Sequence, residues 1–447
     1  MRYISNTPAQ QREMLARIGA GSIEDLLAGV PAKARLSRPL ALPVAMAETD
    51  LVRHLRAMAA RNAGADDYAC FLGAGSYDHA IPSPINHLIS RGEFFTAYTP
   101  YQPEASQGTL RTIFEYQTMM AELTGMDVAN ASIYDGASSL AEAVLMAHAV
   151  TGRDAILLSR GVNPLYRQVV ETYCEGVDVR LRSAPLGDGV TDLEALRKAV
   201  SEKTAAVVVQ YPNFFGCLED VRAAAEIAHA AGALLVVVAD PVNLGLLTPP
   251  GALGADIVVG EGQGLGVSMS FGGPSLGVFA AKQDLVRRMP GRLVGATVDR
   301  DGQRGFVLTL QTREQHIRRE KATSNICTNV ALCALMATIY VSILGKQGLR
   351  KVGELSAAKA HYAAGALAQV PGVRLRFGAP FFKEFTLELP KSPERVVKRL
   401  MKDKILAGVP LKVLDRQHKD CLLVAVTEKR TKDEIDAYAA ALAAAVA

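Results

Sequence analysis

The sequence predicts an α/β protein built on a mainly parallel β-sheet, with a smaller α+β domain at its C-terminal end. Between residues 155 and 282, short apolar runs recur, and helical stretches separate the first four of them. Strands that are apolar throughout and alternate with helices are typical of parallel sheets covered on both faces. Ligands of such sheets bind beyond the carboxyl ends of the strands.

The elements of this sheet follow one another closely along the chain. We expect strands at residues 155–158, 177–181, 205–210, 234–239, 257–259 and 276–280, and helices at residues 164–173, 193–202 and 220–231. The last third has a different order, with strands at 373–377, 385–389, 411–414 and 422–427 and helices at 329–344, 394–404 and 432–445. That order predicts a small α+β domain that closes against the large one.

Three domains are expected along the chain. Residues 1–61 read as a polar helical segment, whose first helix follows Asn6-Thr7-Pro8. Residues 62–325 form the large α/β domain, and residues 326–447 form the small α+β domain. Within the large domain, residues 73–101 are irregular and rich in Gly, Pro, Ser, Tyr and His. A long irregular stretch inside a compact enzyme is usually functional.

Composition and charge exclude several classes of protein. The 447 residues are 49% hydrophobic and 21% charged, and the net charge of +4 gives no reason to expect a nucleic-acid partner. Apolar runs such as residues 233–239 are too short to cross a bilayer, so no membrane association is expected. The first residues lack a signal pattern, and the six cysteines form no C-x-x-C pair. We therefore expect a cytoplasmic protein with reduced thiols and no metal site.

Several common catalytic motifs are absent. The sequence contains no G-x-G-x-x-G, no P-loop and no G-x-S-x-G, which argues against a dinucleotide enzyme, a nucleotide hydrolase and a serine hydrolase with the usual elbow. No H-E-x-x-H occurs either, so a metal hydrolase is not expected.

Polar groups at strand ends are the remaining candidates for chemistry. Ser138 and Ser139 begin a helix candidate, where free backbone N–H groups could hold a phosphate, although a capped helix start has the same pattern. Asp240 ends a buried strand and could hold the protonated nitrogen of a pyridine ring, or it could equally serve as a turn residue. Asn213 lies in a polar turn one strand earlier. Together these residues resemble the ring-holding set of the large pyridoxal-phosphate enzyme fold, fold type I, which is aspartate aminotransferase-like.

Long motifs resemble a single family. Residues 95–110 (FTAYTPYQPEASQGTL), 114–132, 210–220 and 319–328 (REKATSNICT) are similar to glycine decarboxylase, the P protein of the glycine cleavage system. The resemblance covers roughly the whole chain. The family has a form with one long chain of two homologous halves and a form with separate subunits. At this length the chain resembles the N-terminal half, which is subunit 1, or α, of the two-subunit form.

The resemblance implies that this chain lacks the lysine that holds the cofactor. In the family that lysine lies in the other half, shortly before a run ending in Gly-Gly-Pro. Counting back from Gly272-Gly273-Pro274 places Gln263 at that position. A glutamine amide cannot form a Schiff base, because its nitrogen is not a nucleophilic amine. We therefore expect pyridoxal 5′-phosphate to be bound covalently to the partner subunit, with Ser138, Ser139, Asn213, Asp240 and Gln263 as remnants of a cofactor cleft.

The family's reaction implies the function and the partners. Glycine is decarboxylated on pyridoxal phosphate, and the remaining aminomethyl group passes to the lipoyl arm of the H protein. The resemblance therefore implies an aminomethyl-transferring glycine dehydrogenase of α2β2 composition in the glycine cleavage system, together with the T and L proteins. Fold relatives build their active sites at a dimer interface, which suggests that this chain adds a loop to a shared site. The expected contributors are Tyr98, Tyr101, Gln102, Glu104, Ser106 and Gln107.

Alternatives to a shared catalytic site remain open. The loop residues could shape the subunit contact only, which would make the chain a structural or regulatory pseudo-enzyme subunit. A different lysine, with Lys282 as the nearest downstream, could make the chain an independent pyridoxal-phosphate lyase. The charged run at residues 313–321 could guide the H protein, or it could be a solvated or internally paired face.

Overall fold

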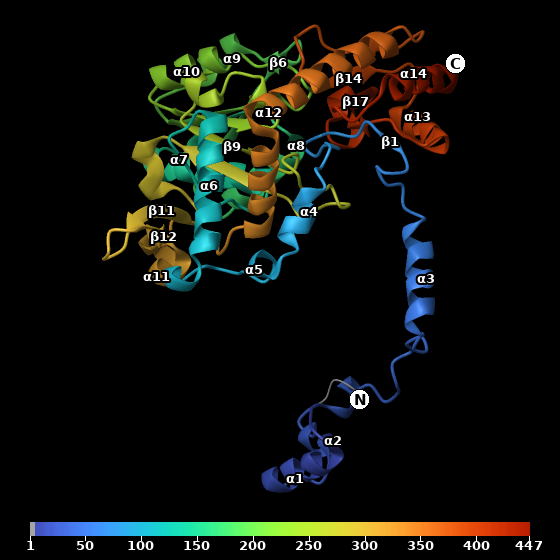
Figure 1. Cartoon of the computed structure of the whole chain (residues 1–447). Coiled ribbons are helices and arrows are strands. Elements are labelled where there is room, and N and C mark those ends of the chain that lie inside the picture. The colour runs from blue at the N-terminus through green and yellow to red at the C-terminus, as the bar shows by residue number, and fades with distance from the viewer. Residues whose placement is uncertain (1–4) are drawn as a thin grey trace. The chain divides into compact units, whose positions relative to one another are not determined.

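The structure, a computed structural model, describes residues 5–447 and contains two compact units, residues 1–63 and 64–447. The first unit holds helices α1 (Pro8–Ile18), α2 (Ile23–Leu26) and α3 (Glu48–Ala59), which Figure 1 labels. None of the three helices has a buried residue. The predicted first helix is present and begins after Thr7, whose hydroxyl accepts a hydrogen bond from Gln10 N at 3.3 Å. Thr7 and Gln10 form a capping box, which is a signal for the start of a helix that can be read from the sequence.

The second unit is built on a seven-stranded sheet. Its strand order is β2 (Val128–Ala129), β10 (Gly277–Ala281), β9 (Ile257–Glu261), β8 (Leu234–Ala239), β7 (Thr204–Tyr211), β3 (Ala155–Ser159) and β4 (Arg180–Ala184). All neighbours from β9 to β4 are parallel, whereas β10 runs antiparallel to both β9 and β2. The mainly parallel sheet predicted from the apolar runs is therefore confirmed.

Alternating side chains of the central strands enter two separate hydrophobic cores. Val207 and Val237 pack with one cluster, and Val208 and Val236 pack with the other. All four side chains are buried, as expected for a parallel sheet covered on both faces.

Helices cover each face of this sheet. Residues of α7 (Gly136–Thr151) and α8 (Pro164–Cys174) complete one core, and residues of α6 (Gln107–Thr124), α10 (Val221–Ala230) and α12 (Ala331–Ala368) complete the other. Figure 1 shows α6 and the first part of α12 side by side, in agreement with their many contacts. The result is a three-layer α/β/α arrangement.

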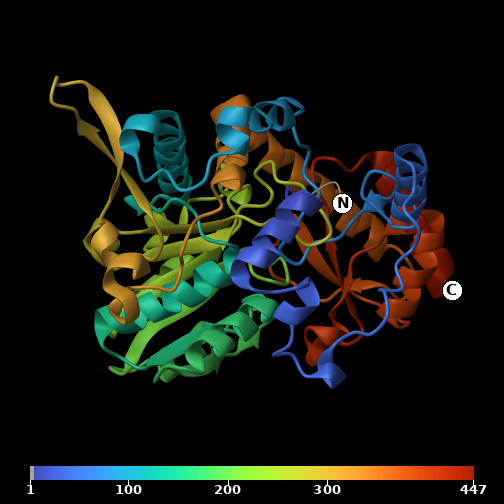
Figure 2. The ribbon, with the colours of Figure 1, turned by 90° about the horizontal axis from the view of Figure 1, so that it is seen from below.

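A four-stranded antiparallel sheet forms the C-terminal part. Its order is β13 (Arg374–Leu375), β14 (Glu384–Glu388), β17 (Cys421–Ala425) and β16 (Val409–Pro410), and it packs with α13 (Pro393–Leu400) and α14 (Lys432–Val446). Figure 2 shows this part in red beside the main sheet. Strand β1 (Ala69–Cys70) pairs with β15 (Ile405–Leu406), so the chain enters the second unit next to this C-terminal part.

Helix α12 links the two cores of the second unit. Its first part contributes Ala334 and Tyr340 to the main core, and its last part contributes Ala363 and Leu367 to the C-terminal core. The backbone is non-helical at Gly345, with φ 60° and ψ −176°, so two helical stretches meet there. By length and composition α12 is the one helix, among residues 5–447, that could cross a membrane. Its place in both cores accounts for its apolar character without a membrane.

The remaining elements are short. They are α4 (Pro84–Ile89), α5 (Gly92–Phe95), α9 (Leu193–Ala199), α11 (Gln315–Arg318), β5 (Leu186–Gly187), β6 (Val190–Thr191), β11 (Leu293–Val298) and β12 (Arg304–Thr309). Strands β11 and β12 form an antiparallel hairpin, drawn in gold, which extends away from the main sheet in Figure 2.

Several predicted elements differ from the structure. The strand expected at 177–181 is β4, three residues later, and the one expected at 411–414 is a 3-10 helix, Leu411–Val413. The strand expected at 373–377 shrinks to the two residues of β13, and the helix expected at 193–202 ends at Ala199. Pro410 precedes the 3-10 turn and lacks an N–H for a longer ladder, which the apolar pattern alone did not reveal.

Candidate functional site

The carboxyl ends of β7, β8 and β9 meet at a small cavity. Its volume, measured as the space open to the centre of a water molecule, is about 40 Å³. The lining residues are Gly75, Tyr77, Asn163, Tyr166, Gln210, Pro212, Asn213, Gly216, Val238, Ala239, Asp240, Asn243, Glu261, Lys383 and Glu384. A cavity of this size holds a few water molecules. It lies where a ligand of such a sheet is expected.

Asp240 follows β8 and is already paired within the chain. Its Oδ1 accepts a hydrogen bond from Val242 N at 2.9 Å, and its Oδ2 lies 2.6 Å from Lys383 Nζ. Oδ2 has no hydrogen bond of good direction among the described residues, so its contact with the ammonium group is electrostatic. Lys383 comes from the C-terminal part, just before β14, and its side chain is 2% exposed.

Two backbone N–H groups at the start of α7, those of Gly136 and Ser138, are also engaged within the chain. Asp135 Oδ1 accepts a hydrogen bond from Ser138 N at 2.6 Å, and Ser139 Oγ donates to Asp135 O at 2.8 Å. The N–H of Gly136, the first residue of the helix, donates to Glu261 Oε2 at 3.0 Å. Ser138 and Ser139 do not line the cavity, and the carboxylate of Glu261 sits where an anion of a ligand would bind.

Gln263 is a structural residue of the loop after β9. Its Oε1 accepts a hydrogen bond from Tyr77 N at 2.9 Å, and its Nε2 donates to Val267 O at 2.6 Å. The side chain is 4% exposed. Both ends of the amide are therefore engaged inside the protein.

Asn213 is held as firmly. Its Nδ2 donates to Gly189 O and to Glu219 Oε1, at 2.7 and 2.8 Å, and its Oδ1 accepts from the N–H groups of Phe215 and Cys217. The side chain lines the cavity, yet both ends of its amide are hydrogen-bonded to other groups of this chain. Its visible role is to shape the turn after β7.

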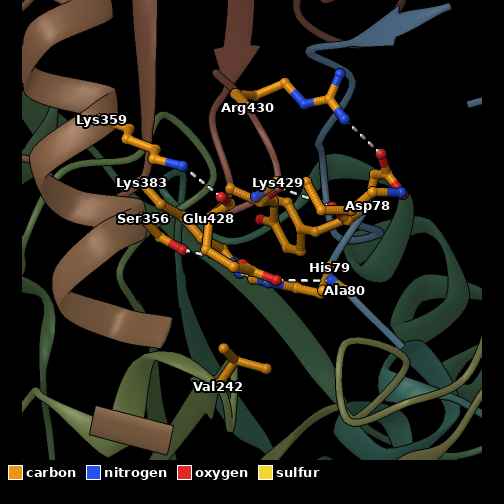
Figure 3. Close-up of polar contacts among 12 residues, drawn as sticks. Asp78, His79, Ala80, Val242, Ser356, Lys359, Lys383, Glu428, Lys429 and Arg430 are labelled. Carbon is orange, nitrogen blue, oxygen red and sulfur yellow. Dashed lines mark hydrogen bonds and ion pairs between the residues drawn. The ribbon is translucent and has the colours of Figure 1, made fainter. Parts of the chain in front are cut away.

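A chain of buried polar groups continues from Lys383 (Figure 3). Lys383 Nζ lies 2.9 Å from His79 Nε2, and His79 Nδ1 lies 2.6 Å from Glu428 Oε2. An ammonium group can only donate, so Nε2 of His79 accepts and the ring is neutral. Burial and the charge of Lys383 lower the pKa of His79, in agreement with this geometry. The geometry then fixes the tautomer: Nδ1–H donates to Glu428, and Nε2 accepts from the ammonium group of Lys383.

Figure 3 also shows the groups around this chain of contacts. Ser356 and Lys359 reach Glu428 from α12, and Lys429 and Arg430 bind Asp78 with distances of 2.7 and 3.2 Å. The network joins the irregular segment around His79 to the C-terminal part. The irregularity of this segment indicated a function, but no motif in the sequence marks His79, Lys383 or Glu428.

The predicted loop residues lie outside the cavity. Tyr98 and Tyr101 are 78% and 52% exposed, and Gln102, Glu104 and Gln107 are exposed as well. Ser106 is half-buried and precedes α6. Gln107 binds the backbone of Phe306 in β12 through both ends of its amide, at 2.9 Å each.

A buried arginine fixes the base of this loop. Arg292, which is 4% exposed, donates to the hydroxyls of Thr99, Tyr101 and Thr328, at 3.1, 3.1 and 2.6 Å. Its Nε also lies 3.5 Å from Glu314 Oε2. Two of the long sequence motifs, 95–110 and 319–328, therefore converge on one residue that the sequence analysis did not select.

The charged run at 313–321 is mixed in character. Arg313 and Glu314 are buried, and Arg313 donates to the carbonyls of Met289 and Gly291. The other residues of the run are exposed or half-buried. The run is therefore paired internally at its beginning and solvated beyond it.

Pyridoxal phosphate does not fit the residues present in this chain's cleft. The carboxylate that would hold the pyridine nitrogen is paired with Lys383, and a carboxylate occupies the helix N-terminus that would hold the phosphate. The residue expected at the position of the Schiff-base lysine is Gln263, whose amide is engaged at both ends inside the protein. No step of a reaction can therefore be derived through a cofactor bound here.

Comparisons with known proteins identify relatives over the full length. The family model of the glycine cleavage system P-protein matches residues 1–442. A probable glycine dehydrogenase (decarboxylating) subunit 1 from Chlorobium phaeobacteroides is 55% identical over 439 residues, with 98% of each chain covered. The corresponding subunit from Carboxydothermus hydrogenoformans is 53% identical over 436 residues, again with 98% of each covered.

Solved structures agree with these relatives. A crystal structure of the glycine decarboxylase P-protein in an inhibitor-bound form is 49% identical, with a TM-score of 0.90 and full coverage of both chains. Glutamate decarboxylase from Lactobacillus brevis is 13% identical, with a TM-score of 0.68 over 93% of this chain and 95% of that chain, which shows the fold alone. The fold is that of the fold type I pyridoxal-phosphate enzymes, as the sequence predicted. The chain belongs to the glycine cleavage system P-protein family, in which its full-length relatives are the chains named subunit 1 of glycine dehydrogenase (decarboxylating).

Proposed function

We propose that this chain is one half of a two-subunit glycine decarboxylase, and that the second subunit carries the pyridoxal phosphate. The observation that supports this division most directly is the cleft itself, where Gln263, the residue expected at the lysine position, has both ends of its amide engaged. The full-length match to chains named subunit 1 supports it as well, because that name implies a second subunit.

The proposed reaction belongs to the pair of subunits. Glycine is decarboxylated, and the remaining aminomethyl group is transferred to the lipoyl arm of the H protein, in a cytoplasmic system that includes the T and L proteins. We expect two copies of each subunit. The cofactor on the partner supplies the electron sink when it is bound, and this chain orients and shields the shared site.

The loop at residues 95–107 is the proposed contribution of this chain. Its base is held by Arg292 and by the contact of Gln107 with β12, whereas Tyr98 and Gln102 point into solvent. A loop that is anchored at its base and carries an exposed aromatic residue is suited to entering the active site or the interface of a partner. Tyr101 has its hydroxyl engaged by Arg292, so its role is to position the loop.

The division of labour can be tested with the two subunits separately and together. The assay is exchange of the glycine carboxyl group with labelled bicarbonate in the presence of H protein, and borohydride reduction followed by peptide mapping locates the cofactor lysine. We expect exchange only with both subunits present and a reduced adduct only on the partner. An adduct on Lys282, or on any other lysine of this chain, would contradict the proposal and favour an independent lyase.

A purely structural role is the second candidate, and the filled cleft is the observation that favours it. Tyr98→Phe and Gln102→Ala in the reconstituted enzyme distinguish the two candidates. If the loop enters the shared site, we expect exchange to fall at least tenfold, about 1.4 kcal/mol of transition-state stabilisation. Tyr362→Phe is the matched control, because Tyr362 is exposed and its hydroxyl binds Asp436 in the C-terminal part. Unchanged exchange with normal assembly would support the structural role.

A further inference from the structure

We propose that Lys383 and Glu261 are internal replacements for the two charged ends of a pyridine-phosphate ligand, so that this chain's own cleft is closed by its own side chains. The inference rests on the proposed function only in placing the cofactor on the partner. It adds the residues that keep the homologous cleft closed. Closure of this cleft can be tested by ligand binding, without an assay of catalysis.

Lys383 takes the place of a ring cation. Its ammonium group lies 2.6 Å from the Asp240 carboxylate at the end of β8, which is the group suited to a protonated ring nitrogen. The same nitrogen lies 3.8 Å from the centre of the Tyr77 ring, so it sits over an aromatic face. With its side chain 2% exposed, Lys383 is one of the largest fully buried side chains in the described part of the protein.

Glu261 takes the place of an anion at the helix start. Its carboxylate accepts hydrogen bonds from three backbone N–H groups, those of Gly136, Gln263 and Leu276, at 3.0, 2.9 and 2.8 Å. Burial raises the pKa of Glu261, and these three N–H donors oppose that effect by stabilising the ionised form. An N-terminus of α7 that is satisfied in this way has no free donor at Gly136 for a phosphate.

Lys383 has its partners within the chain and needs no ligand. The neutral His79 accepts a hydrogen bond from Lys383 and orients it, and Glu428 fixes the tautomer of His79. A buried ion pair with further hydrogen bonds is costly to break from one side, because the remaining charge is left without a partner. A ligand that displaced Lys383 from Asp240 would meet this cost, which explains why the cleft stays closed.

Binding of an aldehyde-free probe tests the closure. Pyridoxamine 5′-phosphate cannot form a Schiff base with a lysine. Its binding to the full-length chain therefore reports on the cleft alone, and it is measured by equilibrium dialysis and by the fluorescence of the ligand. We expect no saturable binding by the natural chain at millimolar probe, and binding at least tenfold tighter by the double variant Lys383→Ala with Glu261→Ala. Lys282→Ala is the control, because Lys282 pairs with Asp256 outside the cleft. Stoichiometric binding by the natural chain, or none by the folded double variant, would overturn the proposal.

A double-mutant cycle covers the case in which the opened variant does not fold. The variants are Asp240→Asn, Lys383→Met and the combination of both, and the measurement is the thermal midpoint of the full-length chain. We expect each single change to lower the midpoint by several degrees and the combination to lower it by less than the sum. The exposed pair Lys432 and Asp436 provides a control cycle, in which the shifts should be small and additive. Additive shifts at Asp240 and Lys383 would contradict a functional ion pair.

The two proposals fail separately. A borohydride adduct on this chain would overturn the division of labour between the subunits. Binding of pyridoxamine 5′-phosphate by the natural chain would overturn the closure even if every adduct lay on the partner. The first result reports on which subunit carries the reactive lysine, and the second reports on whether this chain's cleft admits a ligand.

Discussion

At the scale of single residues, the buried network joins groups that lie far apart in the sequence, with Lys383 2.6 Å from Asp240 and 2.9 Å from His79. Asp240 and Asn213 were located from sequence because the carboxyl ends of parallel strands meet at one edge of the sheet. Lys383 contacts Asp240 from another part of the fold, and its own neighbourhood, Phe381-Phe-Lys-Glu-Phe385, reads as an edge of a strand. No local pattern distinguishes a buried lysine of this kind from a solvated one.

Arg292 should control the loop that carries Tyr98. Its guanidinium group binds three hydroxyls in different directions, which the single ammonium group of lysine cannot reproduce. We expect Arg292→Lys to lower the stability of the chain by about 1.5–3 kcal/mol and to reduce exchange by the reconstituted enzyme. Thermal unfolding and the exchange assay are the measurements.

The control for Arg292 is Arg197→Lys. Arg197 is exposed and pairs with Glu194 in the same helix, so its replacement should leave both readouts nearly unchanged. Normal stability and exchange in Arg292→Lys would show that the loop does not depend on its buried anchor.

Glu384 should make the stability of the chain depend on pH. Burial raises the pKa of Glu384 to about 7, against the effect of hydrogen bonds from Ala74 N and the Tyr77 hydroxyl. The folded state therefore keeps a proton that the unfolded state releases near the ordinary value of 4.5. This contribution is fully present below that value and is lost as pH rises to about 7, with a magnitude on the order of 3 kcal/mol.

Glu384→Gln removes this titration. Thermal midpoints measured between pH 4.5 and pH 8 should fall less with rising pH in the variant than in the natural chain. Part of the pH dependence should remain in the variant, because burial also raises the pKa of Glu142 to about 7. Glu388→Gln is the control, because the hydrogen bond from Arg374 lowers the pKa of Glu388 and gives the opposite sign. Parallel profiles for the natural chain and Glu384→Gln would refute the assignment.

At the scale of elements, the sequence predicted the strands of the parallel sheet, whereas α6 and the hairpin of β11 and β12 were not expected. The strands of the parallel sheet were found because both of their faces are buried and apolar, and only β4 was displaced, being an edge strand with exposed residues. The helix expected to end at residue 344 continues to Ala368. The glycine at 345 was a reasonable stop signal, since its backbone is indeed non-helical there, yet a second helical stretch follows directly.

Gly345 is required by its backbone rather than by crowding. Its φ of 60° and ψ of −176° fall in a region that is essentially restricted to glycine, and a Cβ there would meet nothing within 4 Å. We expect Gly345→Ala to destabilise the chain by about 1–3 kcal/mol, measured by thermal or urea unfolding. Gly365→Ala in the same helix is the control. It also has open space but lies in ordinary helical backbone, so it should stabilise by up to about 1 kcal/mol. Equal effects of the two changes would show that strain at Gly345 is not the cause.

At the scale of the whole molecule, the first unit lacks a core of its own. Its described residues include no buried side chain, and α3 carries Leu51, Leu55 and Met58 on one face, with exposed fractions of 43%, 52% and 50%. An apolar stripe of this kind is a surface suited to packing against another part of this chain or against another protein. The sequence indicated the helices but not their partner, because periodicity shows which face is apolar and not what covers it.

Removal of residues 1–63 should therefore separate assembly from folding. The second unit has its own cores, so the truncated chain should keep a thermal midpoint within a few degrees of the full chain. Its association with the partner subunit, measured by light scattering after size exclusion, should weaken at least tenfold, because the apolar face of α3 is lost. The triple variant Leu51→Ser, Leu55→Ser and Met58→Ser tests the same surface without changing the length of the chain. Full association by both variants would show that the partner binds elsewhere, and the exposed faces of the first unit would then need another occupant.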